Sequence, residues 1–404
     1  MSWICCQLGS REHYAVPAAL HKEGKLSALL ADTWVTKAEA KALHTLAPNL
    51  AARRNDNIPD ALVRRANSGR LVYEARVRLQ RMSSWDACMY RISWFGKWCA
   101  KQLESCDGET VFSYSYNAQW PFKVAKKRGM SSVLNLIDLA WMEEEITRRL
   151  AADYLALDLG QTIDAPEEYW DGLRREIEMA DKIIVNSEWS KRNWIEAGVP
   201  AAKLVEVPLV YAPEVRSDEW LVTSDESRLE KLKTGNAKKL KALFLGSVIL
   251  RKGVGQLFDA IKLLKNEPVE FTFAGPIGVK IPDDVSRMPN VRFLGPVDKA
   301  TTECLYREAD IFLFPTLSDG FGLTQLEALG HGLPVIASTN CGQVVEDRFN
   351  GLVLPEVSPE TIAEAIMELV RDGDLLLKLK ANACVPDKCD PRHLAPALLA
   401  LERH

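Results

Sequence analysis

The chain has 404 residues, of which 47% are hydrophobic and 26% are charged. Single hydrophobic cores stop growing at roughly 250–300 residues, so this length predicts two domains and excludes a single small binding module. The composition is that of a globular protein and excludes a disordered, collagenous or coiled-coil chain. The formal net charge of −4 is too balanced for a protein that binds mainly the nucleic-acid backbone, so we expect no nucleic-acid partner.

The amino-terminal residues and the cysteines predict a cytoplasmic protein. The start, MSWICCQLGSRE, lacks the basic and apolar regions of a secretory signal, and no stretch approaches the ~18 uninterrupted apolar residues of a membrane span. Nine cysteines are an odd number and the adjacent Cys5 and Cys6 cannot readily bridge, so we expect reduced thiols. Cys384, Cys389 and His393 suggest zinc, but no second close pair completes a tetrahedral site, and we expect no metal there.

Apolar runs alternate with amphipathic helical stretches in both halves, which predicts an α/β protein. In the first half the expected strands are 3–8, 110–116, 132–137 and 182–186, and a helix over 188–197, closed by Gly198, follows the last. In the second half the expected strands are 241–246, 269–274, 291–294, 311–315 and 334–337. This pattern predicts two successive doubly wound units. The polar segment 212–240 suits the connection between them, with the boundary near Pro213.

Residues 51–101 depart from this pattern. They contain eleven Lys or Arg against four Asp or Glu, a local charge of +7, together with Trp85, Trp94 and Trp98. We interpret them as basic helices inserted into the first domain. The composition suits the headgroup level of an anionic membrane or a lipid-diphosphate acceptor. A solvated basic face, with the Trp residues used as core, is an equally good interpretation.

Two adjacent cations follow the first expected strand of the second half. In LFLGSVILRKG, residues 243–253, the strand ends at Gly246 and the chain turns through Ser247 to Arg251 and Lys252. The carboxyl edge of a parallel sheet is where doubly wound folds bind ligands, and paired cations there suit a diphosphate. Taken alone, the same pair fits a solvated cap of the loop.

A glycine-rich turn, SDGFGLTQLE, follows the fourth expected strand of the second half. Gly320 and Gly322 allow the backbone to approach a ligand closely, and the helix that opens near Leu323 directs free N–H groups and a partial positive charge towards an anion. Asp319 and Glu327 are eight positions apart and can face the same ligand from opposite sides of the loop. Carboxylates of this kind accept hydrogen bonds from sugar hydroxyls.

The run from Asp319 to Glu327 resembles the E-x7-E signature of the family 4 retaining glycosyltransferases, and GLPVIAS follows it as in that family. The turn from Gly246 to Gly253 resembles the family's phosphate-binding loop. Residues 180–211 are similar to the last strand, helix and strand of the family's first domain. The resemblance covers residues 180–372 well and the first 180 residues poorly.

This resemblance implies a GT-B fold, in which two Rossmann-like domains face a cleft. The implied organisation is an acceptor-side domain over 1–212 that carries the basic insert 51–101, a nucleotide-sugar donor domain over 213–382, and a carboxyl-terminal helical segment over 383–404 that packs back on the first domain.

The resemblance also implies roles for the donor-side residues. Arg251 and Lys252 would neutralise the donor diphosphate, Glu327 would bind the ribose, and Asp319 would contact hydroxyls of the transferred sugar. No metal or cofactor is expected, because these cations and the helix N-terminus meet the charge of the leaving diphosphate. The rest of the implied donor site consists of Gly246, Ser247, Gly320, Phe321, Gly322, Leu323 and Thr324.

On the donor side, two positions depart from the family pattern. Asp319 stands in place of the usual Glu and is shorter by one methylene group. Ser247 stands where many members have an Arg, which leaves Arg251 as the substitute. The identity of the donor therefore stays open.

On the acceptor side, the run Gly9-Ser10-Arg11-Glu12-His13 takes the place of a Gly-Gly loop, and Asp138 follows Ile137 where many members have a His-Asp pair. We expect Gly9 and Ser10 to form the acceptor-side loop and His13 and Asp138 to be catalytic residues on that side. Each of the last two also fits a structural role, His13 at a helix start and Asp138 as a strand-end cap.

The sequence therefore predicts a retaining glycosyltransferase that moves a sugar from a nucleoside diphosphate sugar to a hydroxyl of a glycan or lipid-linked acceptor. We expect it to act in cell-surface polysaccharide synthesis, in peripheral contact with an anionic membrane at its cytoplasmic face. Nucleotide-sugar epimerases of the same fold match the E-x7-E pattern less well. The alternative is a catalytically silent subunit that binds nucleotide-sugar or a partner protein, which the departures at Ser247, Ile137 and Asp319 leave open.

Overall fold

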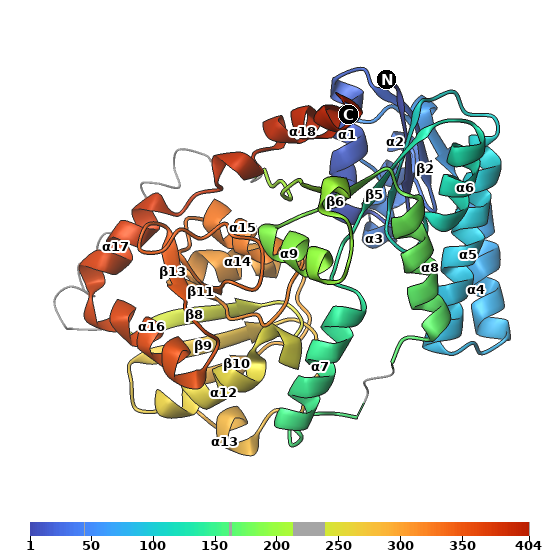
Figure 1. Ribbon diagram of the computed structural model, residues 1–404. Coiled ribbons are helices and arrows are strands. Elements are labelled where there is room, and N and C mark those ends of the chain that lie inside the picture. The colour runs from blue at the N-terminus through green and yellow to red at the C-terminus, as the bar shows by residue number, and fades with distance from the viewer. Residues whose placement is uncertain (44, 161–163, 213–238, 404) are drawn as a thin grey trace.

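The computed structural model describes residues 1–43, 45–160, 164–212 and 239–403, which contain two parallel sheets with helices around them (Figure 1). The strands of the first sheet are β1 (Trp3–Gln7), β2 (Leu26–Ala31), β3 (Val63–Arg65), β4 (Thr110–Tyr114), β5 (Ser131–Asn135), β6 (Lys182–Val185) and β7 (Leu204–Glu206). Those of the second are β8 (Leu240–Leu245), β9 (Val269–Ala274), β10 (Val291–Phe293), β11 (Ile311–Phe314), β12 (Val335–Ser338) and β13 (Gly351–Leu354).

The helices follow the strands in both halves. In the first half they are α1 (Ala15–Lys22), α2 (Lys37–Leu43), α3 (Pro48–Ala51), α4 (Asn67–Leu79), α5 (Ser84–Leu103), α6 (Gln119–Lys127), α7 (Trp141–Asp153), α8 (Glu167–Met179) and α9 (Glu188–Glu196). In the second half they are α12 (Val254–Leu263), α13 (Asp283–Ser286), α14 (Lys299–Glu308), α15 (Leu323–Gly330), α16 (Pro359–Arg371), α17 (Gly373–Asn382) and α18 (Leu394–Ala400).

Both sheets are doubly wound. The strand orders are β3-β2-β1-β4-β5-β6-β7 and β10-β9-β8-β11-β12-β13, and neighbouring strands pair in parallel. The direction of winding reverses between β1 and β4 in the first sheet and between β8 and β11 in the second, which opens a crevice at the carboxyl ends of those strands. The predicted α/β class is confirmed.

All nine predicted strands are present, with ends that differ by no more than two residues. The apolar runs predict them because strands covered by helices on both faces bury every side chain. Strands β2, β3 and β13 were not predicted. The run LSALLA of β2 has no β-branched residue, and β3 and β13 are only three and four residues long. The predicted boundary near Pro213 lies outside the described residues.

Helix α7 joins the two domains. It follows β5 of the first sheet, within the range 1–212 assigned to the first domain, yet Leu150 and Leu157 belong to the apolar core that surrounds β8, β9 and α12. The backbone N–H of Lys280 also donates to the carbonyl of Leu157 at 2.9 Å. Figure 1 shows α7 beside α12 and β10 rather than among α4, α5 and α6. Part of the second core is therefore built from the first half of the chain.

The end of the chain returns to the first sheet. Leu394 and Leu398 of α18 are buried with Trp3 and Leu20, and the indole N–H of Trp3 donates to Glu402 at 2.5 Å. Figure 1 accordingly places the carboxyl terminus close to α1. The two domains are thus linked by α7 and by this terminal segment.

The basic segment 51–101 contains the expected helices, α4 and α5, and also the edge strand β3. Trp94 and Trp98 pack against the apolar core of the first domain, and Trp94 stacks on Tyr73 at 6.0 Å. This packing favours the interpretation that uses these Trp residues as core over the one that places them at headgroup depth. None of the helices in the described ranges is long and apolar enough to cross a membrane.

Candidate functional site

Two loops meet at the point where the second sheet reverses its winding. The loop after β8 ends in the short 3₁₀ helix η4 (Leu250–Lys252), and the loop after β11 leads into α15. The N–H of Leu317 donates to the carbonyl of Arg251 at 2.9 Å, so the loops are joined directly. Gly253 has a φ of +74°, and a Cβ there would lie 1.9 Å from the Pro315 carbonyl oxygen. Only glycine fits this crossing, and it brings the two cations of η4 against the end of β11.

Both cations are paired with carboxylates. Nη1 of Arg251 lies 3.1 Å from Oε1 of Glu143 and donates to the Ser318 carbonyl at 2.5 Å. Nζ of Lys252 donates to Oδ2 of Asp319. The structure therefore brings together Arg251, Lys252 and Asp319 as the sequence predicts, and adds Glu143 from the first domain.

The carboxyl groups at this junction lie in a half-buried, crowded environment. The pKa of Glu143 is raised to about 7, mainly by burial and also by the charges of Asp138 and Asp319, although the charge of Arg251 lowers it. Burial also raises the pKa of Asp138, whereas the charges of Arg11 and Arg251 lower it. Groups from both domains therefore share one electrostatic environment.

The glycines of the turn after β11 face protein atoms. A Cβ at Gly320 would lie 2.7 Å from the carbonyl oxygen of Ile137, and a Cβ at Gly322 would lie 2.3 Å from the Phe314 ring. Gly322 also has a φ of +84°. The first domain at Gly320 and the core at Gly322 thus occupy the side that a Cβ would fill, and the close approach of their backbone to a ligand stays a prediction. The side chain of Phe321 is buried, so this residue offers only its backbone to the site.

The start of α15 is exposed to this junction without a capping side chain. Gly322 is the N-cap and has no side chain that could cap the first turn, which contains Leu323 and Thr324. An uncapped first turn keeps N–H donors and a partial positive charge available to an anion. Gly246 and the exposed Ser247, at the end of β8, complete the set of predicted donor-side residues.

Glu327 lies one turn further along α15. Its Oε2 accepts a hydrogen bond from the hydroxyl of Tyr306 at 2.9 Å, and the Tyr306 ring stacks on His331 at 4.9 Å. The carboxylate is therefore held in place by α14 and is only half-buried. It is separate from the cation pairs of η4.

The predicted acceptor-side aspartate lies at the domain junction. Oδ1 of Asp138 accepts hydrogen bonds from the Tyr116 hydroxyl at 2.6 Å and from the Ala140 N–H at 3.0 Å. Its backbone adjoins Gly320, whose carbonyl accepts hydrogen bonds from the hydroxyls of Ser187 at 2.7 Å and Ser190 at 3.0 Å. The first domain therefore contacts the glycine-rich turn from two sides.

The loop after β1 lies at the reversal point of the first sheet. The N–H of Gly9 donates to Asp32 at 2.9 Å, and Ser10 precedes a run in which Glu12, His13 and Tyr14 all have left-handed φ values of 49°, 48° and 63°. Such a run in residues with side chains is conformationally costly and is typical of functional loops. His13 is exposed, so the structure places its side chain towards solvent.

Several residues of this junction were missed from the sequence. Glu143 belongs to the acidic run Glu143–Glu145, which is the ordinary composition of a helix start and marks no site. Ser318 precedes the recognised motif, and Ser187 and Ser190 read as a helix cap. The sequence predicted the two loops of the second domain, but not which residues of the first domain contact them.

The cysteines considered for zinc do not cluster with further ligand side chains in the described part of the chain. No three His, Cys, Asp or Glu side chains there are grouped in a way that could hold a metal ion. Cys389 is buried and Cys384 exposed, and His393 pairs with Asp387 at 3.0 Å.

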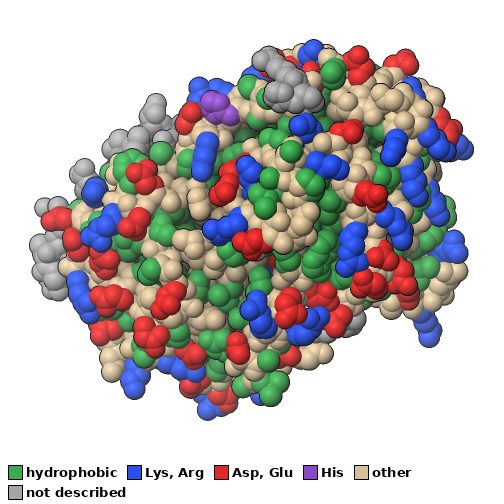
Figure 2. All heavy atoms as spheres, in the orientation of Figure 1, with side chains coloured by type: hydrophobic (Ala, Val, Ile, Leu, Met, Phe, Trp, Pro, Cys, Tyr) green, Lys and Arg blue, Asp and Glu red, His purple; other side chains and the backbone are tan. Residues whose placement is uncertain are grey.

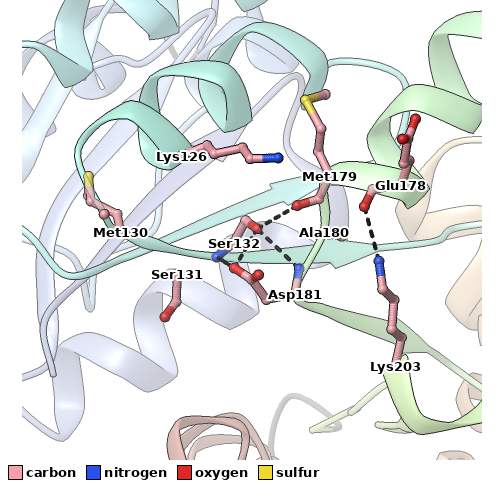
Figure 3. A pocket seen from close by; sticks show the side chains of 10 residues that line it. Lys126, Met130, Ser131, Ser132, Glu178, Met179, Ala180, Asp181 and Lys203 are labelled. Carbon is pink, nitrogen blue, oxygen red and sulfur yellow. Dashed lines mark hydrogen bonds between the residues drawn. The ribbon is translucent and has the colours of Figure 1, made fainter.

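A hollow of about 650 Å³ lies at the opposite end of the first sheet, before β5 and β6 (Figure 3). Its polar groups mostly contact one another. Oδ2 of Asp181 accepts from the N–H and the hydroxyl of Ser132, both at 2.8 Å, and Nζ of Lys203 donates to the carbonyl of Glu178 at 3.0 Å. This hollow is remote from the loops that carry the predicted residues.

The second domain matches a known family. Residues 239–372 match the family model described as glycosyl transferases group 1. An uncharacterised glycosyltransferase of Methanocaldococcus jannaschii is 30% identical over 148 residues, which are 35% of this chain and 41% of that protein. A D-inositol 3-phosphate glycosyltransferase of Jonesia denitrificans is 30% identical over 157 residues, 35% of this chain and 37% of the relative. The chain thus spans less than half the length of these relatives.

The whole chain matches solved structures. Anabaena HepE in complex with UDP and glucose superposes with a TM-score of 0.62 at 13% identity, covering 100% of this chain and 99% of that one. Sucrose-phosphate synthase from Thermosynechococcus elongatus gives 0.66 at 15% identity, with 100% and 98% covered. The chain therefore has the two-domain GT-B fold, and residues 239–372 of its second domain match the model of the group 1 glycosyl transferases.

Proposed function

We propose that the protein transfers a sugar, with retention of anomeric configuration, from a nucleoside diphosphate sugar to a hydroxyl of a glycan or lipid-linked acceptor. One observation carries this proposal. Arg251 and Lys252 gather with Asp319 and the uncapped start of α15 at the crevice of the second sheet, and Asp138 of the first domain lies against the same turn. Paired cations and free N–H groups at such a crevice are suited to a diphosphate.

In this proposal each donor-side group meets one part of the donor. Arg251 and Lys252 bind the diphosphate after exchanging their carboxylate partners for phosphate oxygens, and the N–H groups of α15 complete that site. Glu327 accepts hydrogen bonds from the ribose, and Asp319, freed from Lys252, accepts them from the sugar. The bond between the anomeric carbon and the diphosphate oxygen breaks, the acceptor oxygen bonds to the same face of that carbon, and the proton of the acceptor hydroxyl passes to the departing diphosphate. The cations stabilise the leaving diphosphate without a metal ion.

The acceptor enters from the first domain. Asp138 follows β5, and the loop of Gly9, Ser10 and His13 follows β1, so both lie at the carboxyl edge of the first sheet. The solved HepE structure contains UDP and glucose, and this likeness of fold supports a nucleotide-sugar as the donor of this chain. We place the reaction in cell-surface polysaccharide synthesis.

Peripheral contact with an anionic membrane is supported by α4. Leu71, Val72 and Leu79 are 72%, 64% and 84% exposed, and their spacing places them on one face of the helix. Arg76 and Arg78 flank this face and take part in no ion pair found among the described residues. In Figure 2 blue and green side chains mix on the side of the molecule where Figure 1 places α4 and α5. A basic helix with an exposed apolar face suits the cytoplasmic surface of an anionic bilayer.

A donor-hydrolysis assay across UDP- and GDP-sugars tests the proposal. An enzyme of this kind releases nucleoside diphosphate slowly even without acceptor, and replacing both Arg251 and Lys252 by Ala should abolish that release. A chain that binds a nucleotide-sugar but releases nothing, with or without a panel of glycan and lipid acceptors, would be the silent subunit instead. The carboxylate partners of both cations are the observation that favours this second function.

A further inference from the structure

Glu143 reaches from the first domain into the proposed diphosphate site. It lies in the first turn of α7, which begins directly after the acceptor-side loop of Asp138 and ends in the core of the second domain. The position of Glu143 is therefore set by both domains. No other side chain of the first domain, among the described residues, forms an ion pair with the cations of η4.

The contacts of Glu143 are those expected of a phosphate oxygen. Its Oε1 accepts from the guanidinium of Arg251 at 3.1 Å and from the hydroxyl of Ser318 at 3.2 Å, and its side chain is 14% exposed. Guanidinium and hydroxyl donors bind carboxylate and phosphate oxygens in the same way. One oxygen of Glu143 thus occupies the donors that a diphosphate would use.

We propose that Glu143 occupies the phosphate subsite of Arg251 when no donor is bound, and that a nucleoside diphosphate binds there by displacing it. Glu143 is then a positioning residue that links occupation of the donor site to the start of α7 in the first domain. This inference rests on the proposed function, because it takes Arg251 to be a diphosphate ligand.

Displacement changes the charge balance around Glu143. The groups that face it are Arg251 from η4, Ser318 and Asp319 from the turn after β11, and Asp138 and Tyr116 from the first domain. Without Arg251, the carboxylate would lie beside two other carboxylates and the added phosphates. Negative charges close to a carboxyl group favour its protonated form. Because the pKa of Glu143 is already about 7, we expect it to take up a proton when the diphosphate binds.

The affinity for a nucleoside diphosphate should therefore fall as the pH rises above 7. Below pH 7 Glu143 is mostly protonated before binding, so displacement requires no further proton. Above pH 7 a proton must be taken up, and the affinity falls by up to tenfold for each pH unit. At pH 8 the variant E143Q should therefore bind a nucleoside diphosphate about 10-fold more tightly than the wild type, and at pH 6 about equally.

Isothermal titration of UDP, GDP and ADP at pH 6 and pH 8 tests this, with the wild type, E143Q and E145Q. Glu145 lies on the same helix and pairs with Arg148 at the surface, so E145Q removes the same charge and should behave as the wild type. Comparing the variants at one pH cancels the titration of the nucleotide itself. A second measurement uses the wild type alone. Titrations at pH 8 in buffers of different ionisation enthalpy should show uptake of about one proton per nucleotide bound.

Either of two results would overturn the inference. E143Q could bind as weakly as the wild type or more weakly at pH 8, which would mean that Glu143 merely orients Arg251. Alternatively, the wild type could bind a nucleotide at pH 8 without taking up a proton. This second result overturns the inference even if E143Q does not fold. Should the wild type bind none of the three nucleotides, the proposed function itself fails and the inference with it.

Discussion

Replacing Gly320 by Ala tests the contact between the domains. The added Cβ would lie 2.7 Å from the carbonyl oxygen of Ile137, closer than real Cβ atoms come, and the obstructing atoms are backbone. The turn must therefore move away from the first domain, which weakens the hydrogen bonds from Ser187 and Ser190 to the Gly320 carbonyl. Two such bonds contribute about 1 kcal/mol each and overpacking costs about 1–3 kcal/mol, so the domain contact should weaken by roughly 3–5 kcal/mol.

Scanning calorimetry and steady-state kinetics measure this effect. We expect the unfolding transition of G320A to shift downwards by roughly 5 °C or more and kcat/KM for the donor to fall by at least about 10-fold. The control is G172A in α8, where an added Cβ has no atom within 4 Å and should stabilise the helix by roughly 0.5–1 kcal/mol. If G320A matched the wild type in both Tm and kcat/KM, the domains would not be in contact at this turn in solution.

Three further predictions concern the proposed activity. Replacing Glu327 by Ala should lower kcat/KM by about 10- to 150-fold with the fold intact, since a charge-assisted hydrogen bond contributes ~1.5–3 kcal/mol; unchanged turnover would remove Glu327 from the site. Activity should survive EDTA because the two cations of η4 and the start of α15 supply the positive charge, and loss that Mg²⁺ or Mn²⁺ restores would contradict this. Co-sedimentation with phosphatidylglycerol vesicles should occur at low salt, weaken at high salt and disappear on charge reversal of Arg76, Arg78 and Arg81. Binding that survives the reversal would show that α4 does not face the bilayer.

The pattern of the sequence determined the fold class and the two loops of the site. Buried parallel strands are recognisable because most of their side chains are apolar, and the loops after β8 and β11 are recognisable because their glycines and charges are contiguous. Strand β2 escaped prediction because its Leu and Ala residues suit a helix as well as a strand. Such patterns involve only a few neighbouring residues, so they can be recognised in the sequence without the tertiary structure.

Only the tertiary structure decided which groups meet at the site. Glu143 and Arg251 are 108 positions apart, and they pair because α7 leaves the first sheet and packs into the second core. Likewise Gly320, expected to let the backbone approach a ligand, adjoins Ile137 of the other domain. Helix packing, and not local sequence, brings such residues together, because burial of an apolar face depends on a partner that is distant along the chain. The composition of an acidic helix start is the same whether it faces solvent or an arginine.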